Sequence, residues 1–240
     1  MDAAADNGRL DVVKWLHANR TEGCTTDAMD CAAANGHLEI IRWLHENRSE
    51  GCTTGAMDRA AANGHLEIIQ WLHENRTEGC TRHAANNAAE FAHLDTLKWL
   101  HENHSEKGSA MAMTLAASNG HLDVVQWLHE KRTEGRTVKA PVYTAGGGHF
   151  EVLKWLHANT ELEWSTSVMD AASTLPVLQW LHDNRIEGCS TRAMDDAASR
   201  NQFDKNGHVE MFLWLFHNYR DQVDMFRLRA FGSHHWMQIF

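Results

Sequence analysis

Residues 32–44 read Ala-Ala-Ala-Asn-Gly-His-Leu-Glu-Ile-Ile-Arg-Trp-Leu, and near-copies of this segment recur along the 240-residue chain. The Trp-Leu pair at its end returns at five successive intervals of 28 residues, followed by one interval of 25 and one of 34. The tryptophan positions are Trp15, Trp43, Trp71, Trp99, Trp127, Trp155, Trp180 and Trp214. A fixed period of about 20–50 residues is typical of stacked units that bury their apolar faces only against their neighbours.

Each unit carries the pattern of two helices joined by a turn. In the second unit, Thr25 or Thr26 is placed to cap the first helix, and Asn35-Gly36 ends it, because glycine accepts the left-handed backbone conformation. A second helix follows, with apolar residues at the spacing of one buried face. These residues are Leu38, Ile40, Ile41, Trp43 and Leu44.

The two prolines of the chain give an independent check on this phasing. Pro141 falls at the start of a predicted first helix, and Pro176 falls at the start of a predicted second helix. Proline is tolerated in the first turn of a helix and rarely later. Both positions therefore agree with the predicted helix boundaries.

The sequence thus predicts an all-α protein, an elongated solenoid of stacked helix-turn-helix repeats over residues 1–223. The predicted units are residues 1–24 (partial), 25–52, 53–80, 81–108, 109–136, 137–164, 165–189 and 190–223. Residues 224–240 leave the pattern, and we expect them to form a C-terminal cap or a flexible tail. Because the first unit begins in mid-helix, we expect either a fragment of a longer array or a misplaced start.

Segment 32–44 resembles the centre of the ankyrin repeat, whose paired helices carry Ala-Ala-x-x-Gly-His-Leu-x-Val-Val-x-Leu-Leu, and the resemblance recurs through residues 1 to about 220. Ankyrin repeats have about 33 residues. The residues missing here come from the segment that forms their projecting hairpin finger, so the chain is similar to a short-period (28-residue) ankyrin-like variant without long fingers. The resemblance implies protein binding without catalysis, although not through the usual finger-mediated contacts.

The formal net charge is −10, from 22 basic and 32 acidic residues. Net acidity disfavours sequence-independent binding to nucleic acid or to an anionic membrane, although it leaves room for a local basic patch. No apolar stretch approaches the roughly 20 residues of a membrane span, and the N-terminus lacks the pattern of a secretory signal. We therefore predict an intracellular, cytoplasmic monomer that binds a protein and has no nucleic-acid, membrane, small-molecule or cofactor ligand.

Four of the five cysteines occupy one repeat position: Cys24, Cys52, Cys80 and Cys189. Neighbouring helices in a stack lie about 8–10 Å apart, which exceeds the Cα separation of about 7 Å that a disulfide can bridge. Reduced thiols are therefore favoured over disulfides.

Histidine forms two columns among the 18 histidines of the chain. One column follows the Trp-Leu pair and consists of His17, His45, His73, His101, His129, His157 and His182. The other opens the second helices and consists of His37, His65, His93, His121, His149 and His208. A metal site needs three or four convergent ligands, which the pattern does not supply. Hydrogen bonds to backbone carbonyls at helix ends are the favoured role, and a pH or metal sensor is a secondary hypothesis.

Neither the tryptophans nor the polar residues indicate catalysis. The tryptophan column shares the phase of Ile41 and Leu44, so packing is favoured over a stacking platform for bases or sugars. Serine, histidine and carboxylate residues recur unit by unit, whereas a catalytic constellation occurs once. We therefore predict that the protein is not an enzyme.

Two positions in the first helix, four residues apart, change chemistry in nearly every unit. The pairs are Asp27/Cys31, Gly55/Arg59, His83/Asn87, Met111/Leu115, Lys139/Tyr143, Ser167/Ala171 and Arg192/Asp196. This spacing places both residues of a pair on one helix face, and stacking would line these faces into a stripe. The sequence leaves two interpretations open, neutral variation on a solvent-exposed face or a partner-binding surface.

The functional prediction is a non-catalytic scaffold that binds a protein partner along this stripe. The predicted contact residues are Asp27, Cys31, Arg59, His83, Asn87, Met111, Leu115, Lys139, Tyr143, Arg192 and Asp196. Their central part mixes apolar and basic side chains, as interfaces commonly do. The competing prediction is a structural spacer, or a piece of a longer array, without a partner of its own.

Overall fold

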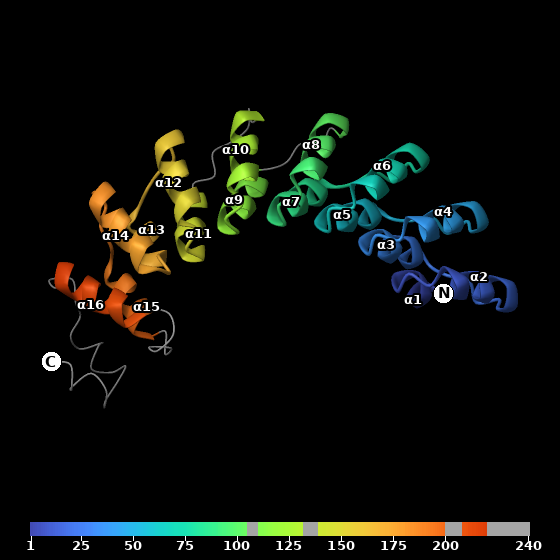
Figure 1. Ribbon diagram of the computed structural model, residues 1–240, viewed down its shortest axis with the longest axis horizontal. Coiled ribbons are helices and arrows are strands. Elements are labelled where there is room, and N and C mark those ends of the chain that lie inside the picture. Colours follow the sequence, from blue (N-terminus) through green and yellow to red (C-terminus); the bar gives the residue numbers. More distant parts are fainter. Residues whose placement is uncertain (105–109, 132–138, 200–207, 220–240) are drawn as a thin grey trace. The chain divides into compact units, whose positions relative to one another are not determined.

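The structure is a computed structural model, and it describes residues 1–104, 110–131, 139–199 and 208–219. Within these ranges the secondary structure is entirely helical, from α1 to α16, with no strand (Figure 1). The tail predicted at residues 224–240 lies outside the described residues. The boundaries predicted between units stay a prediction.

Short first helices alternate with second helices along the chain. The first helices are α1 (Asp2–Asp6), α3 (Asp27–Ala34), α5 (Thr54–Ala62), α7 (Arg82–Glu90), α9 (Ala110–Ser118), α11 (Ala140–Gly147), α13 (Thr166–Ala171) and α15 (Thr191–Ser199). The second helices are α2 (Leu10–Asn19), α4 (Leu38–Asn47), α6 (Leu66–Asn75), α8 (Leu94–Asn103), α10 (Leu122–Lys131), α12 (Phe150–Asn159), α14 (Leu175–Asn184) and α16 (His208–Asn218).

The chain divides into two compact units, one of residues 1–116 with 123–135 and the other of residues 117–122 with 136–240. In the first, α1, α3, α5 and α7 stack in order, and each packs against the second helix that follows it. In the second, α11 packs on α13 and α13 on α15, while α14 packs on α16. The predicted all-α fold of stacked helix-turn-helix repeats is therefore confirmed.

The core joins small residues of the first helices to branched residues of the second helices. Ala32 and Ala33 are fully buried, which lets neighbouring first helices approach closely, and Ile41 on α4 is fully buried too. Leu38 and Trp43, predicted within the same buried stripe, are only half-buried. The buried stripe is therefore narrower than the apolar pattern indicates.

The turns between helices have the left-handed glycines, and the helix starts have the prolines, that the sequence predicts. Gly36 and Gly64 have φ values of 82° and 72°, in the left-handed region that glycine tolerates. Pro141 and Pro176 lie in the first turns of α11 and α14, as predicted. Among the described residues, Ala92 is the one non-glycine residue with positive φ, at 62°, because the Asn-Gly joint is replaced there by Phe-Ala.

A buried carboxylate links α3 to α5, α5 to α7 and α13 to α15. Asp58 on α5 accepts hydrogen bonds from the Thr81 backbone N–H at 2.8 Å and from Thr81 Oγ1 at 2.6 Å. Thr81 Oγ1 in turn accepts from the His83 N–H at 3.1 Å and so caps α7. The same arrangement joins Asp30 to Thr53. Sequence patterns revealed the threonine cap but not this carboxylate partner.

Replacing Ala92 with glycine should raise the free energy of unfolding by about 1 kcal/mol, because an L side chain in the left-handed region is strained. Urea denaturation measures the change. The mirror-image control is Gly64→Ala, which should destabilise the protein, since a methyl group there would lie 2.5 Å from His93 Nδ1. Equal stability of the wild type and Ala92→Gly would contradict the strain.

Removing the Asp58 carboxylate by Asp58→Ala should lower the free energy of unfolding by about 2 kcal/mol, because the buried Thr81 donors lose a charged acceptor. Asp58→Asn should cost less, since an amide oxygen still accepts and asparagine stands at the equivalent position 86. The exposed Asp95→Ala is the control, and it should change stability by less than about 0.5 kcal/mol. A loss for Asp58→Ala no larger than for this control would refute the assigned role.

Candidate interaction surface

The predicted contact residues lie on the solvent side of the first helices, which we call the first-helix face. Seven of them are exposed: Asp27, Arg59, His83, Met111, Lys139, Tyr143 and Arg192. The other four are half-buried: Cys31, Asn87, Leu115 and Asp196. Residues from Asp27 to Leu115 belong to the first compact unit, and those from Lys139 to Asp196 belong to the second.

Some of the predicted residues are brought into contact. Arg59 Nη1 donates to Cys31 Sγ at 3.8 Å, which joins the variable positions of α3 and α5. Arg192 forms an ion pair of 3.5 Å with Asp196, one helical turn away. Within the first unit, neighbouring first helices therefore present adjacent parts of one face.

Two further exposed side chains of this region were missed by the sequence analysis. Phe91 follows Asn87 by one helical turn and is 54% exposed. Arg82, the first residue of α7, is also exposed. Extending the i, i+4 series by one step to the joint, from His83 through Asn87 to Phe91, would have found the phenylalanine.

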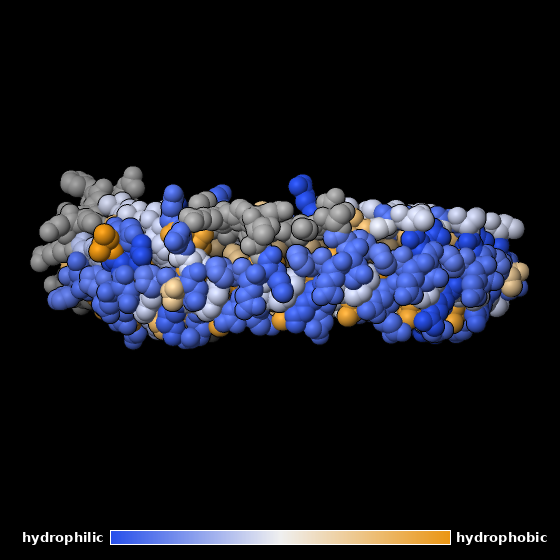
Figure 2. Space-filling model, turned by 90° about the horizontal axis from the view of Figure 1, so that it is seen from above, coloured by the Kyte–Doolittle hydropathy of each residue, from blue (hydrophilic) through white to orange (hydrophobic). Residues whose placement is uncertain are grey.

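The second helices present a different surface, seen from above in Figure 2. This view is largely hydrophilic, with scattered hydrophobic residues. Exposed carboxylates recur there, including Glu39, Glu67 and Asp95. Several pair with a cation three residues later on the same helix, such as Arg42 or Lys98. A carboxylate recurs at this position in most repeats, whereas the residue three positions later alternates between a cation and glutamine from residue 42 to residue 154.

The first histidine column packs edge-on against tryptophans of the following unit. Ring centroids lie 5.1–5.4 Å apart with interplanar angles of 83–88°. The pairs are His17–Trp43, His45–Trp71, His73–Trp99, His101–Trp127, His157–Trp180 and His182–Trp214. These tryptophans are half-buried, so they pack at the margin of each interface and not in its centre.

Two histidines of the second column contact backbone carbonyls, as predicted for this column. His37 Nε2 lies 3.2 Å from the carbonyl oxygen of Asp6, and His93 Nε2 lies 3.1 Å from that of Ala62. Both rings also sit against the glycine of the preceding joint. In these two positions the histidine therefore holds one unit against its neighbour.

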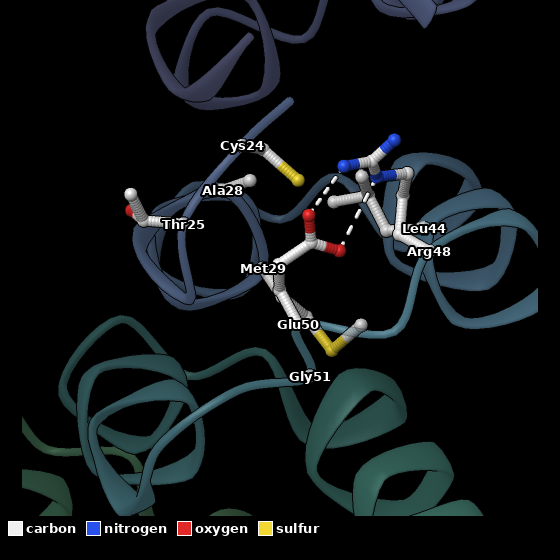
Figure 3. A pocket seen from close by; sticks show the side chains of 8 residues that line it. All are labelled: Cys24, Thr25, Ala28, Met29, Leu44, Arg48, Glu50 and Gly51. Atoms are coloured by element: carbon white, nitrogen blue, oxygen red, sulfur yellow. Dashed lines mark hydrogen bonds and ion pairs between the residues drawn. The ribbon is translucent and has the colours of Figure 1, made fainter. Parts of the chain in front are cut away.

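A small hollow lies beside an Arg-Glu pair where the first two repeats meet, within the first compact unit (Figure 3). Cys24, Met29 and Leu44 line it together with the ion-paired Arg48 and Glu50, and its interior is too narrow to admit a water molecule. Ligand pockets usually enclose about 300–1,000 Å³. The size of the hollow is therefore that of a packing defect.

The equivalent contacts in the next unit have shifted pKa values. A hydrogen bond from Arg76 lowers the pKa of Glu78 to about 2, and burial raises the pKa of the Cys52 thiol to about 11. Glu78 is thus ionised and Cys52 protonated at neutral pH. The five cysteines are free thiols. In the part of the chain that the structure describes, no group of three histidine, cysteine or carboxylate side chains is placed to hold a metal ion.

His104 takes the place that Arg48 and Arg76 occupy in the preceding units. Its ring lies 4.9 Å from that of His73, and its Nε2 is buried without a hydrogen-bond partner. Burial lowers the pKa of His104, and the neighbouring His73 lowers it further. Protonation of this histidine is therefore unfavourable in the folded protein.

A family model described as ankyrin repeats (many copies) matches residues 1–45, 29–73, 57–101 and 83–129. The chain belongs to the ankyrin repeat family. The starts of the first three matches are separated by the 28-residue period of the sequence.

The ankyrin fold is also found by structural comparison. The crystal structure of the human ASB11 ankyrin repeat domain matches with a TM-score of 0.60 and 19% sequence identity, over 77% of this chain and 97% of that one. A search of curated proteins gives no significant match. Every helix in the described ranges is too short or too polar to cross a lipid bilayer.

Lowering the pH from about 7.5 to about 5.5 should destabilise the wild type more than a His104→Thr variant, which carries the residue found at position 160. A histidine whose pKa is lowered by folding makes its full contribution to the free energy of unfolding above its unfolded pKa of about 6.5. This contribution is lost as the pH falls. Urea denaturation at the two pH values measures the difference. Identical pH dependence in the two proteins would contradict the burial of this imidazole.

Proposed function

We propose that this ankyrin repeat protein is a non-catalytic scaffold that binds a protein partner along its first-helix face. Ankyrin repeats are in general protein–protein interaction modules, and stacked repeats offer extended surfaces for binding. We further propose that the partner binds on the first-helix face, that the protein is cytoplasmic and that it is a monomer.

The observation that carries the proposal is a contrast between two sets of positions in the same helices. The buried alanines are repeated, as Ala32, Ala60 and Ala88 show. The variable position in the first turn of these helices instead changes from Asp27 to Gly55 and then to His83, and Asp27 and His83 are exposed. Because packing fixes the first set and not the second, the exposed positions are free to match a partner.

The chemistry of the side chains supports the absence of catalysis. Many histidines are committed to interfaces, through tryptophan rings in one column and through carbonyl oxygens in the other. The best-placed carboxylates, Asp30 and Asp58, are buried and hold threonines of the next unit. These groups therefore serve packing and capping.

A triple variant tests the proposed face in the first compact unit, residues 1–116 with 123–135. Replacing Arg59, His83 and Met111 with alanine should reduce partner recovery from a native lysate by about tenfold or more, because a few contact residues dominate an interface. Recovery is quantified by mass spectrometry against the wild type. Helicity and melting should change little, since the three side chains are exposed.

The matched control replaces Arg42, Glu67 and Lys98 on the second helices, and it should leave recovery unchanged. A parallel variant of Lys139 and Tyr143 tests the face of the second unit. Undiminished recovery by both first-helix variants would refute the choice of face. If the wild type captures no specific protein at all, the chain is a structural spacer.

A further inference from the structure

We propose that helix α11 opens and refolds locally while α14 and α16 stay folded, and that it presents its part of the first-helix face only when it is closed. That part consists of Lys139 and Tyr143, which are both exposed. This inference rests on the proposed function and concerns the regulation of the face in the second compact unit. A partner that binds this part must therefore stabilise the closed helix.

The residues of α11 are poor helix formers. The helix reads Ala140-Pro-Val-Tyr-Thr-Ala-Gly-Gly147, and its two β-branched residues and two glycines are all less favourable in a helix than alanine. Its N-cap residue, Lys139, makes no side-chain hydrogen bond, whereas Thr53 and Thr81 cap α5 and α7. The stability of α11 therefore depends on its packing.

The packing of α11 is also limited. Its buried residues are Ala140, Pro141, Thr144 and Ala145. Pro141 stands at the repeat position where α5 buries Met57, so α11 buries less apolar area than α5. Segments with few buried apolar contacts open at a lower free-energy cost than the whole protein.

The connection from α11 to the next first helix lacks the buried carboxylate. In the same compact unit, Asp170 on α13 accepts hydrogen bonds from the Ser190 N–H at 2.7 Å and from Ser190 Oγ at 2.6 Å. On α11 the position of Asp170 is held by Val142, which packs against the apolar core, and the position of Ser190 is held by Ser165. Ser165 therefore has no carboxylate acceptor at that position, and its side chain does not cap α13.

The turn after α12 lacks a second stabilising contact. In the turn after α14, Arg185 and Glu187 form a half-buried ion pair of 2.5 Å. The equivalent residues after α12 are Thr160 and Leu162, which cannot form an ion pair with each other. Charge-assisted hydrogen bonds are stronger than neutral ones, so the α11–α12 hairpin lacks a contribution that the α13–α14 hairpin has.

Neutral hydrogen bonds define the closed position of α11. Thr144 Oγ1 donates to the carbonyl oxygen of Ala117 at 3.2 Å, and the Ser173 N–H donates to that of Ala145 at 3.1 Å. A neutral hydrogen bond contributes little net free energy, because water replaces it on opening. Helix α11 thus has one defined place in the fold and leaves it at a small cost in free energy.

Hydrogen exchange on the full chain, measured by mass spectrometry, tests the inference. The amides of α11 should exchange at least about tenfold faster than those of α5, which is linked to both of its neighbours through Asp30 and Asp58. Exchange in α11 should depend only weakly on urea, because a local opening exposes little surface. Exchange in α14 should instead accelerate with urea as expected for unfolding of the whole unit.

The first variant, Gly146→Ala, strengthens α11 without a clash. Its methyl group would lie 3.6 Å from the Ala171 carbonyl oxygen, an ordinary contact, so the gain in helix propensity should slow exchange in α11 about fivefold. The matched control is Gly147→Ala, whose methyl group would lie 2.8 Å from the Ser118 carbonyl oxygen. This neighbouring substitution should not slow exchange.

The second variant, Val142→Asp, supplies the missing carboxylate to Ser165. It should slow exchange in α11 and in the first turn of α13 by about threefold or more, because two donors gain a charged acceptor. Adding Ser165→Ala removes the hydroxyl donor and should reverse part of this gain. Circular dichroism melting of each variant shows that the fold is retained.

Three results would each overturn the inference: equal exchange rates in α11 and α5, a urea dependence of α11 that matches that of α14, or unchanged α11 exchange in Gly146→Ala. These outcomes do not depend on any partner. If the variant of Lys139 and Tyr143 keeps its partner while α11 exchanges as expected, the local opening stands and its role in binding fails with the choice of face. Slow exchange in α11 together with lost partner recovery leaves the proposed function intact and removes this inference.

Discussion

Hydrogen bonds to a buried carboxylate join α3 to α5, α5 to α7 and α13 to α15, and the stacking of these helices depends on them. Asp58 holds both the backbone and the hydroxyl of Thr81, and that hydroxyl caps the helix that follows. Because the carboxylate is desolvated, leaving it without these donors would be costly, so the spacing between the first helices that it joins is fixed. Alanine packing, the histidine–tryptophan pairs and the Arg-Glu pairs all lie at the same interfaces and require that same spacing.

This constraint separates the residues that build the array from those that face solvent. Interface residues vary little between most repeats, because every repeat meets a similar neighbour. Arg59, His83 and Met111 are outside that requirement, as their side chains are exposed. The first-helix face can therefore combine acidic, basic and apolar side chains without loss of packing.

The sequence predicted the helices, the joints and both prolines because these depend on local chemistry and on a period that repeats many times. It did not predict the role of Asp58, since a carboxylate inside a helix gives no sign of its partner in another unit. The width of the buried stripe was overestimated for a similar reason: Trp43 has the right helical phase, but its contact with His17 places it at the edge of the interface. Phe91 was missed because it lies at a joint, outside the helical positions that were compared.

The contacts between repeats also join residues that are close in the sequence. The hydrogen bonds between units join residues 20 to 37 positions apart, as in the Asp170–Ser190 and His182–Tyr219 contacts. Proteins dominated by such local contacts fold without bringing distant segments together, and domains form progressively during synthesis. A nascent chain can therefore dock each newly completed hairpin on the one before it while the ribosome is still translating the rest.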